Sequence, residues 1–253
     1  MIDIHAHILP GIDDGANSFE TSLRMAKMAV DCGVDRMIVT PHCNVEDLYE
    51  NYYSDEQTKL LNDLENRLKE KHINLKLAPG MEVYATEDVP ELIHQGKLIT
   101  LNHSRYLLIE FNFHEDGVLI DYLLKEISRQ GLHPIVAHPE RYPYVQNNPS
   151  LVLEWIYQGC SLQVNKGSIL GGFGQKAYST SHYLLNQHLV AVVASDAHGV
   201  DRRTTYLSDA YRYIAFQYSE EYADMLLNEN PSRILEDRGL INQRPISGRL
   251  RYI

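Results

Sequence analysis

Short apolar runs alternate with longer amphipathic segments along this chain of 253 residues, and this alternation limits the possible folds more than any other feature. The apolar runs cover residues 1–7, 36–40, 75–79, 106–109, 134–137, 162–164 and 190–194, and helical patterns follow at about 19–32, 55–71, 87–95, 118–130, 149–158, 174–187 and 204–228. Seven successive strand-then-helix units imply parallel strands joined by right-handed crossovers. For a chain of this length we predict an α/β barrel that is closed or nearly closed.

The chain has no sequence repeat, low-complexity linker or composition break, so we predict a single domain over residues 1–253. Gly33, Gly131 and Gly159 stand where a predicted helix gives way to the next strand, as is typical of glycine caps at helix C-termini. The last stretch, about 243–253, is mildly basic and has no clear periodicity. We expect a packed or frayed tail there, with a partner-docking tail as the alternative.

The composition limits the location and the class of partner. No apolar run approaches the roughly 18 residues that cross a bilayer, and the N-terminus lacks a basic region before an apolar core, so we expect a cytoplasmic protein without membrane insertion. Cys32, Cys43 and Cys160 are odd in number and widely spaced, which argues against a disulfide framework. The net charge of -11 disfavours nucleic acid as a partner. A small anionic substrate stays possible if bound cations reverse the local field.

Metal-ligand residue types follow most of the predicted strands. His5 and His7 are two apart at the end of the first strand, so their side chains face the same side. The residues that follow the other strands, together with one in the glycine-rich loop after the first strand, are His42, Glu82, Glu110, His138, Asp196, His198 and Asp14. Any one of them could be a salt-bridged or packed residue. Because the strand C-termini of a parallel barrel meet in one mouth, six of seven strands ending this way favour a metal cluster.

Nine ligand-type side chains are too many for one ion, because a catalytic zinc takes about three protein ligands. We therefore predict two or three divalent ions, with one carboxylate shared between them. Histidine and carboxylate ligands without cysteine suit manganese, iron or zinc, and we favour manganese. Cys43 lies next to His42 but is expected to be a buried bystander.

Two arginines indicate a phosphorylated substrate. Arg141 and Arg203 flank predicted ligand positions, and a planar guanidinium matches two phosphate oxygens at once. Loop salt bridges are the alternative for either residue. A cysteine-dependent phosphatase needs an arginine six residues after its cysteine, but here those positions hold Ile38, Tyr49 and Lys166. The sequence excludes that mechanism.

Several short motifs occur together in a fixed order. They are His5-x-His7, the Asp-Asp-Gly loop at 13–15, Thr40-Pro-His42, Gly80-Met-Glu82, Leu108-Ile-Glu110-Phe, Ala137-His138-Pro-Glu-Arg141, Gln163-x-Asn165 and Ala194-Ser-Asp196-Ala-His198. From residue 1 to about 240 the chain resembles the polymerase-and-histidinol-phosphatase (PHP) superfamily. Within it, the chain is most similar to the CpsB-type, metal-dependent protein-tyrosine phosphatases of Gram-positive bacteria.

The resemblance implies a distorted (β/α)7 TIM-like barrel, with the nine ligand-type residues as a trinuclear site and Arg141 and Arg203 as phosphate-binding residues. It also implies a phosphotyrosine-containing protein substrate, namely the bacterial tyrosine kinase that controls capsular or exopolysaccharide synthesis. The chain departs from the family at Cys43, where a second histidine is frequent. It also reads Arg203-Thr-Thr205 where Arg-Pro-Pro is frequent.

The expected reaction is hydrolysis of a phosphomonoester by a metal-activated hydroxide, without a covalent phosphoenzyme. His42, His198 and Asp14 are the candidates for the general acid. One of the tyrosines in the predicted connections could stack on a phenyl ring, although solvated loop tyrosines are the plainer interpretation; these are Tyr49, Tyr52, Tyr53, Tyr84 and Tyr144.

Three other functions fit parts of this pattern. A small-molecule phosphatase, such as histidinol-phosphate phosphatase, would use the same scaffold. A phosphodiesterase or exonuclease is disfavoured by the net charge of -11. A non-catalytic protein that keeps the metals and docks to a kinase is disfavoured by the complete ligand set.

Overall fold

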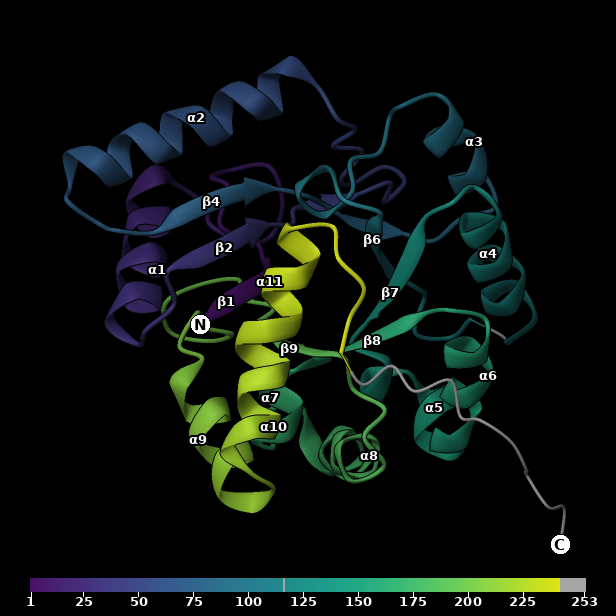
Figure 1. Ribbon diagram of the computed structural model, residues 1–253. Helices are drawn as coiled ribbons and strands as arrows, with labels where there is room; N and C mark the ends of the chain where they lie inside the picture. Colours follow the sequence, from purple (N-terminus) through teal and green to yellow (C-terminus); the bar gives the residue numbers. More distant parts are fainter. Residues whose placement is uncertain (116, 242–253) are drawn as a thin grey trace, which may run out of the picture.

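The computed structural model describes residues 1–115 and 117–241, so the tail predicted at 243–253 lies outside the described residues. All seven predicted strands are present and surround a common axis (Figure 1). They are β1 (Ile2–Ala6), β2 (Arg36–Val39), β4 (Lys76–Pro79), β6 (Tyr106–Glu110), β7 (His133–Ala137), β8 (Ser161–Asn165) and β9 (Val192–Ala194). Every strand pair is parallel, as the alternation of strands and helices predicts.

Two short strands that the sequence did not predict continue β2 and β4. They are β3 (His42–Cys43) and β5 (Glu82–Tyr84), and the breaks before them fall at Pro41 and Gly80. A Cβ on Gly80 would lie 2.8 Å from Ile38 Cγ2, so this close approach requires glycine. The breaks divide the strands into one sheet of order β1-β2-β4 and another of order β3-β5-β6-β7-β8-β9.

The first and last strands close the barrel. Ala6 forms a parallel bridge with Ala197, the amide of His7 donates to the carbonyl of Ala197 at 2.9 Å, and the amide of Asp196 donates to the carbonyl of His5 at 2.9 Å. The prediction of a closed α/β barrel is therefore confirmed. Closure also places the first motif of the chain beside the last one.

Six predicted helices lie on the outside of the strands in Figure 1, although the fifth of them is shorter than expected. They are α1 (Phe19–Asp31), α2 (Asp55–Glu70), α3 (Val89–His94), α4 (Gly117–Arg129), α6 (Val152–Tyr157) and α8 (Gly174–Asn186). Short helical turns that were not predicted are η1 (Leu101–His103), η2 (Pro139–Arg141), α5 (Pro143–Asn147) and α7 (Lys166–Ile169). The helix predicted over 149–158 is divided into the 3-10 turn η3 (Pro149–Leu151) and α6. Gly33, Gly131 and Gly159 have φ angles of +91°, +83° and +92°, which confirms their role as helix caps.

The single helix predicted over 204–228 is wrong. The structure has α9 (Ser208–Gln217), α10 (Glu220–Asp224), the π-helical turn η4 (Met225–Glu229) and α11 (Asn230–Leu235). The break has a local cause, because the Ser219 side chain accepts a hydrogen bond from the Tyr222 amide and starts a new helix. The apolar periodicity continues through this break and conceals it.

Helix α11 covers the end of the barrel opposite the strand C-termini. Asn102 Nδ2 donates to the Leu235 carbonyl at 2.8 Å, and the Arg105 amide donates to Asp237 Oδ1 at 2.8 Å, both just before β6 begins. Ile234 packs into a buried apolar cluster with inward residues such as Leu108 and Ile135. This end is therefore filled with apolar side chains, and polar side chains gather at the other end.

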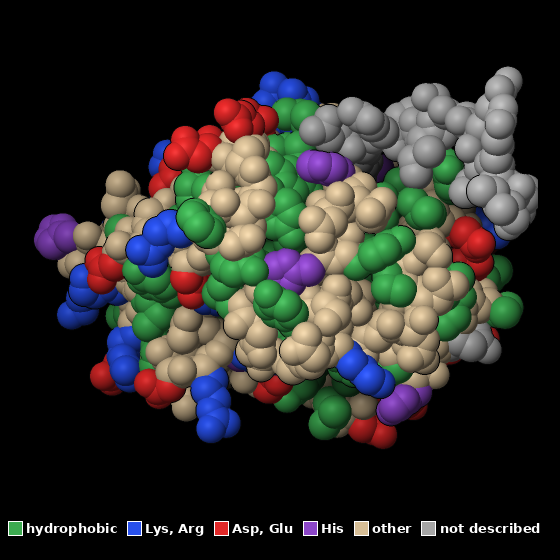
Figure 2. Space-filling view, turned by 90° about the horizontal axis from the view of Figure 1, so that it is seen from below, with side chains coloured by type: hydrophobic (Ala, Val, Ile, Leu, Met, Phe, Trp, Pro, Cys, Tyr) green, Lys and Arg blue, Asp and Glu red, His purple; other side chains and the backbone are tan. Residues whose placement is uncertain are grey.

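The surface agrees with an acidic protein. On the face in Figure 2, as far as its residues are described, lysine and arginine side chains are scattered among acidic and apolar ones and form no basic stripe. This distribution gives no support to a nucleic-acid partner. Among residues 1–115 and 117–241, no helix is both long and apolar enough to cross a membrane.

A buried histidine far from the strand C-termini gives the fold a dependence on pH. Burial lowers the pKa of His133 to about 4, and the charge of Arg105 adds to this; His133 Nε2 lies 2.6 Å from Ser161 Oγ. The folded state then binds fewer protons than the unfolded state, so stability is lost as the pH falls from about 6.5 towards 4. We expect His133→Gln to lessen this loss by about 2 kcal/mol between pH 7 and pH 4.5.

The measurement is urea unfolding of both proteins at pH 7 and pH 4.5. The two proteins have all other acid-sensitive groups in common. The quantity compared is therefore the difference between wild type and variant in the change of unfolding free energy from pH 7 to pH 4.5. An identical pH dependence in the two proteins would show that His133 is not the responsible group.

Candidate metal centre

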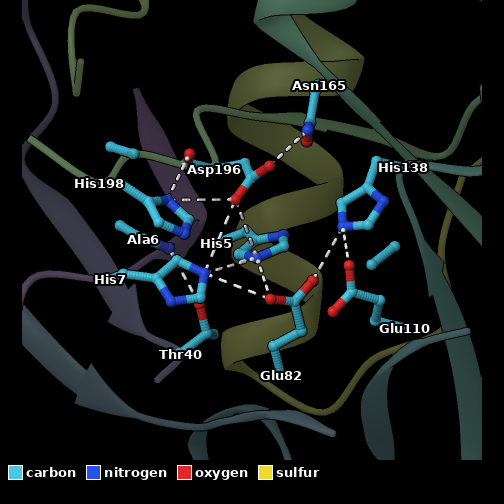
Figure 3. A network of polar contacts seen from close by, with 12 residues as sticks. His5, Ala6, His7, Thr40, Glu82, Glu110, His138, Asn165, Asp196 and His198 are labelled. Atoms are coloured by element: carbon cyan, nitrogen blue, oxygen red, sulfur yellow. Dashed lines mark hydrogen bonds and ion pairs between the residues drawn. The ribbon is translucent and has the colours of Figure 1, made fainter. Parts of the chain in front are cut away.

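The strand C-termini bring together all nine residues that the sequence singles out as ligands. Figure 3 shows Glu82 between His5 and His7 on one side and His138 on the other, with Asp196 and His198 above. Three sets of these side chains have candidate ligand atoms within 4.8 Å of one another: His5, His7 and Asp196; His42, Glu82 and Glu110; and His7, Asp14, His42 and His198. The residues come from both ends of the sequence because the barrel closes between β1 and β9.

The deepest set is formed by the first motif and Asp196. His5 Nε2 and His7 Nε2 lie 3.2 Å apart, and each is 3.2 Å from Glu82 Oε2. Asp196 Oδ1 lies 3.5 Å from His5 Nε2 and 3.6 Å from His7 Nε2. All four side chains are buried. Two imidazole nitrogens and two carboxylate oxygens thus point at one small volume.

Glu82 belongs to the second set and also contacts the two histidines of the first. His42 Nδ1 lies 3.1 Å from Glu82 Oε2 and 3.7 Å from Glu110 Oε2. His138 Nε2 lies 2.9 Å from Glu82 Oε1 and 3.4 Å from Glu110 Oε1. Since Glu82 presents one oxygen to His5 and His7 and the other to His138, it has the position of a bridging carboxylate.

The third set lies at the mouth. Asp14 Oδ1 is 3.5 Å from His42 Nε2 and 3.4 Å from His198 Nε2. Half of the Asp14 side chain is exposed, in contrast to the buried His7 below it. This set is therefore the most accessible to solvent.

The unsatisfied atoms of the cluster fit divalent cations. Among the described residues, the buried atoms Glu82 Oε2, His42 Nδ1 and His198 Nε2 have no hydrogen-bond partner. Buried polar atoms are nearly always paired, so these lone pairs need another partner. Four carboxylates in the cluster also need positive charge, because an uncompensated buried charge is costly. Imidazole and carboxylate donors bind manganese, iron and zinc, and bound ions would satisfy both needs.

The pKa values of the buried groups show the same demand for cations. Burial opposes protonation of His7, but Asp13 and Glu82 outweigh it and raise the pKa of His7 to about 10. Burial, with the charges of Glu82 and Asp196, raises the pKa of Glu110 well above its usual range. In the absence of ions, protons would thus occupy the cluster in their place.

Asp13 is a residue that sequence reasoning passed over in favour of its neighbour Asp14. His7 Nδ1 donates to Asp13 Oδ2 at 2.8 Å, which leaves His7 Nε2 free of a proton for the cluster. The amides of Gly15 and His42 also donate to Asp13, at 2.9 and 3.1 Å. A Cβ on Gly15 would lie 2.2 Å from the His7 carbonyl, so glycine is required there.

Asp13→Asn is expected to weaken metal binding by about 10- to 100-fold without unfolding the protein, because asparagine cannot accept from three converging donors. The dissociation constant for manganese would be measured by competition with a chromophoric chelator. Asp31→Asn, at the exposed end of α1, is the matched control. An unchanged constant in Asp13→Asn would refute the orienting role.

A second supporting chain runs through β8. His5 Nδ1 lies 2.8 Å from Gln163 Oε1, Gln163 Nε2 donates to Asn165 Oδ1 at 2.7 Å, and Asn165 Nδ2 donates to Asp196 Oδ2 at 2.5 Å. These bonds fix the histidine tautomer and the carboxylate orientation. The sequence feature that could have indicated this chain is the Gln163-x-Asn165 motif, which lies on the one predicted strand that is not followed by a predicted ligand.

Both predicted arginines lie at the mouth. Arg203 Nη2 donates to Asp196 Oδ1 at 2.5 Å, and Arg141 Nη1 lies 3.4 Å from Asp196 Oδ2. Arg203, Asp196 and His138 have φ angles of +47°, +50° and +34°, which are uncommon for residues other than glycine. Left-handed backbone at these positions is typical of functional sites, where surrounding contacts maintain it.

The sequence did not reveal that Arg141 packs against an aromatic ring. Its guanidinium carbon lies 4.5 Å from the ring centroid of Phe173, which also lies 5.9 Å from that of Arg203. Glu140, next to it, is buried and accepts hydrogen bonds from the Asn165 amide and from Ser168 Oγ. Burial raises the pKa of Glu140 to about 7, although these donors oppose the shift.

A cleft of about 310 Å³ opens above the cluster. Its lining combines ligand candidates with Arg141 and Arg203 and with the aromatic residues Tyr49, Tyr84, Phe111 and Phe113. Two of the five tyrosines named from the sequence thus lie at the site. Cys43 is buried with its Sγ 3.2 Å from the Glu50 carbonyl, as expected for a bystander.

Comparisons with known proteins agree with this geometry. The sequence profile of the family described as "Capsular polysaccharide synthesis, CpsB/CapC" matches residues 1–236. The chain belongs to the CpsB/CapC family. Among its curated relatives, tyrosine-protein phosphatase YwqE of Bacillus subtilis is 34% identical, with 97% of this chain and 95% of the relative covered. Tyrosine-protein phosphatase CpsB of Streptococcus pneumoniae is 36% identical, with 94% and 99% covered.

Solved structures of the CpsB/CapC family have the same fold. A crystal structure from the work on YwqE and CpsB, described as metal-dependent tyrosine phosphatases, has a TM-score of 0.90 at 34% identity and covers 95% of this chain and 96% of its own. The phosphotriesterase of Mycobacterium tuberculosis, with a TM-score of 0.54 at 10% identity and 95% of both chains covered, shares the fold alone. The expected PHP-type distorted barrel is confirmed.

Proposed function

We propose that this protein is a metal-dependent protein-tyrosine phosphatase of capsular or exopolysaccharide synthesis. The observation that carries the proposal is the convergence of nine ligand-type side chains in one cluster, beneath a cleft that two arginines also line. Family membership and the phosphatase names of YwqE and CpsB support it. The reaction is hydrolysis of a phosphate monoester, in which water takes the place of the tyrosyl oxygen on phosphorus.

We infer that the chain binds two or three divalent ions, with manganese favoured over iron or zinc. The three sets of donors support this number, and Glu82 would be shared between two ions. When bound, the ions would supply a nucleophile near neutral pH by lowering the pKa of water from about 16 to about 7. The ligands would be the nine residues His5, His7, Asp14, His42, Glu82, Glu110, His138, Asp196 and His198.

The chain's own side chains bind and orient the phosphate. Arg141 and Arg203 carry planar guanidinium groups at the cleft, suited to hold phosphoryl oxygens and to compensate charge in the transition state. The tyrosyl leaving group has a pKa near 10, so protonation gives it modest help. Asp14 is the least suited general acid, because its hydrogen bond with His198 lowers its pKa. Burial also lowers the pKa of His198. Of the three candidates we therefore favour His42.

The substrate we propose is a tyrosine-phosphorylated protein, in particular the bacterial kinase that controls polysaccharide synthesis. The acidic chain and the mixed charges in Figure 2 argue against the phosphodiesterase and exonuclease alternatives. We further infer one catalytic domain, supported by the family match over residues 1–236. Its three cysteines form no disulfide, which supports the cytoplasm as its location.

The test compares kcat/KM for a phosphotyrosine peptide and for histidinol phosphate, using the manganese-loaded protein. We expect the peptide to be the better substrate by at least about tenfold, a difference of about 1.4 kcal/mol in transition-state binding. The reverse order would favour the small-molecule phosphatase. Absence of turnover on both substrates in a folded, metal-loaded protein would favour the kinase-docking alternative.

A further inference from the structure

We propose that Phe113 and Tyr49 form the wall against which the phenyl ring of the substrate lies, and that they make this site select aryl over alkyl phosphates. This inference rests on the proposed phosphatase function and names the side chains that would determine its specificity. Both residues line the cleft above the metal centre. Phe113 follows β6 and Tyr49 follows β3, so two separate loops contribute to the wall.

Each ring stacks on a histidine of the cluster. The Phe113 ring stacks on His138 with centroids 6.3 Å apart and an interplanar angle of 17°. The Tyr49 ring stacks on His42 at 5.8 Å and 13°. Because stacking limits rotation of the rings, the cleft presents flat apolar surfaces before a ligand arrives.

The two histidines beneath these rings lie on different sides of the shared carboxylate. His138 contacts Glu82 Oε1 at 2.9 Å, whereas His42 contacts Glu82 Oε2 at 3.1 Å. Phe113 and Tyr49 therefore stand over different parts of the same centre. Both rings are half-buried, so part of each remains accessible from the cleft.

Phe113 is also close to a predicted phosphate-binding residue. The Arg141 guanidinium carbon lies 5.0 Å from the Phe113 ring centroid. In an aryl phosphate the ring is bonded directly to the ester oxygen, so a phosphate held by Arg141 brings that ring towards Phe113. An alkyl phosphate, such as phosphoserine, has no flat ring to stack on Phe113. Stacking between aromatic rings contributes binding free energy beyond that of apolar burial, so an aryl phosphate is expected to bind more tightly.

Phe173 provides the matched control. Its ring lies near Arg141 and Arg203, at 4.5 and 5.9 Å, but it is not among the residues that line the cleft. A Cβ on Gly167 would lie 2.6 Å from Phe173 Cε2, so glycine leaves the space for this ring. Phe173 can therefore support phosphate binding without contacting the phenyl ring.

The experiment measures binding of phenylphosphonate and methylphosphonate to the manganese-loaded full chain by calorimetry. Phosphonates are not hydrolysed, so the reactivity of the leaving group does not enter. We expect Phe113→Leu and Tyr49→Leu each to weaken phenylphosphonate about three- to tenfold more than methylphosphonate. Phe173→Leu is expected to weaken both ligands by the same factor. Thermal midpoints establish that the variants are folded.

An unchanged ratio of the two affinities in both Phe113→Leu and Tyr49→Leu would overturn the inference while leaving the proposed function intact. Wild-type protein that binds neither phosphonate would overturn the proposed function and this inference with it. A larger loss for phenylphosphonate in the two cleft variants, but not in Phe173→Leu, would support the aromatic wall.

Discussion

Asp196→Asn is expected to lower kcat/KM for a phosphotyrosine peptide by about 10³-fold or more. Asparagine has nearly the same shape, but it removes a buried negative charge that faces His5 Nε2 and His7 Nε2. It also leaves Arg203 without its carboxylate partner. The substitution would lower the affinity for metal ions and would also leave the phosphate-binding arginine less well positioned. Both effects lower kcat/KM.

The measurement is phosphate release, together with metal content by elemental analysis of the purified protein. Asp201→Asn is the control, because Asp201 is exposed on the same loop between His198 and Arg203. The control is expected to keep its metal and its activity. An Asp196→Asn protein that retained near-normal turnover would remove Asp196 from the proposed centre.

Arg203→Ala is expected to lower kcat/KM by about 10²- to 10³-fold while the metal content is preserved. Arg203 lines the cleft and is less buried than Asp196, so its loss removes a cation at the substrate without removing a ligand candidate. Arg203→Lys is expected to recover only part of the activity, since an ammonium retains the charge but not the planar pair of donors.

The adjacent Arg202, which is exposed, supplies the matched control. Arg202→Ala is expected to change kcat/KM by less than about threefold, as for most surface substitutions. If both alanine variants lost activity to the same extent, a general effect of positive charge on this loop would explain the result better than direct phosphate binding.

The sequence was sufficient to predict the seven main strands and the convergence of the ligand candidates. The residue after each apolar run could be read directly, and parallel strands in a closed barrel leave their C-termini in one place. His5 and Asp196, from opposite ends of the sequence, were therefore expected in the same mouth. The structure indeed places His5 Nε2 and Asp196 Oδ1 3.5 Å apart.

Contacts that depend on loop geometry could not be predicted from the sequence. Asp13 and Asp14 are adjacent and chemically identical, and only the path of their loop decides which one orients His7. Phe173 reaches both arginines because Gly167 leaves space for its ring, which no periodicity indicates. The break at Ser219, by contrast, carried a capping signal that was outweighed by the apolar pattern of residues 204–228.

The most direct test of the account is phosphate release from a phosphotyrosine peptide after complete chelation and then re-addition of manganese, iron or zinc. We expect activity to vanish on chelation and to return with at least one of these ions, manganese giving the fullest recovery. Activity that survived complete removal of metal, or a folded and metal-loaded protein that released no phosphate from the peptide, would contradict a metal-dependent tyrosine phosphatase.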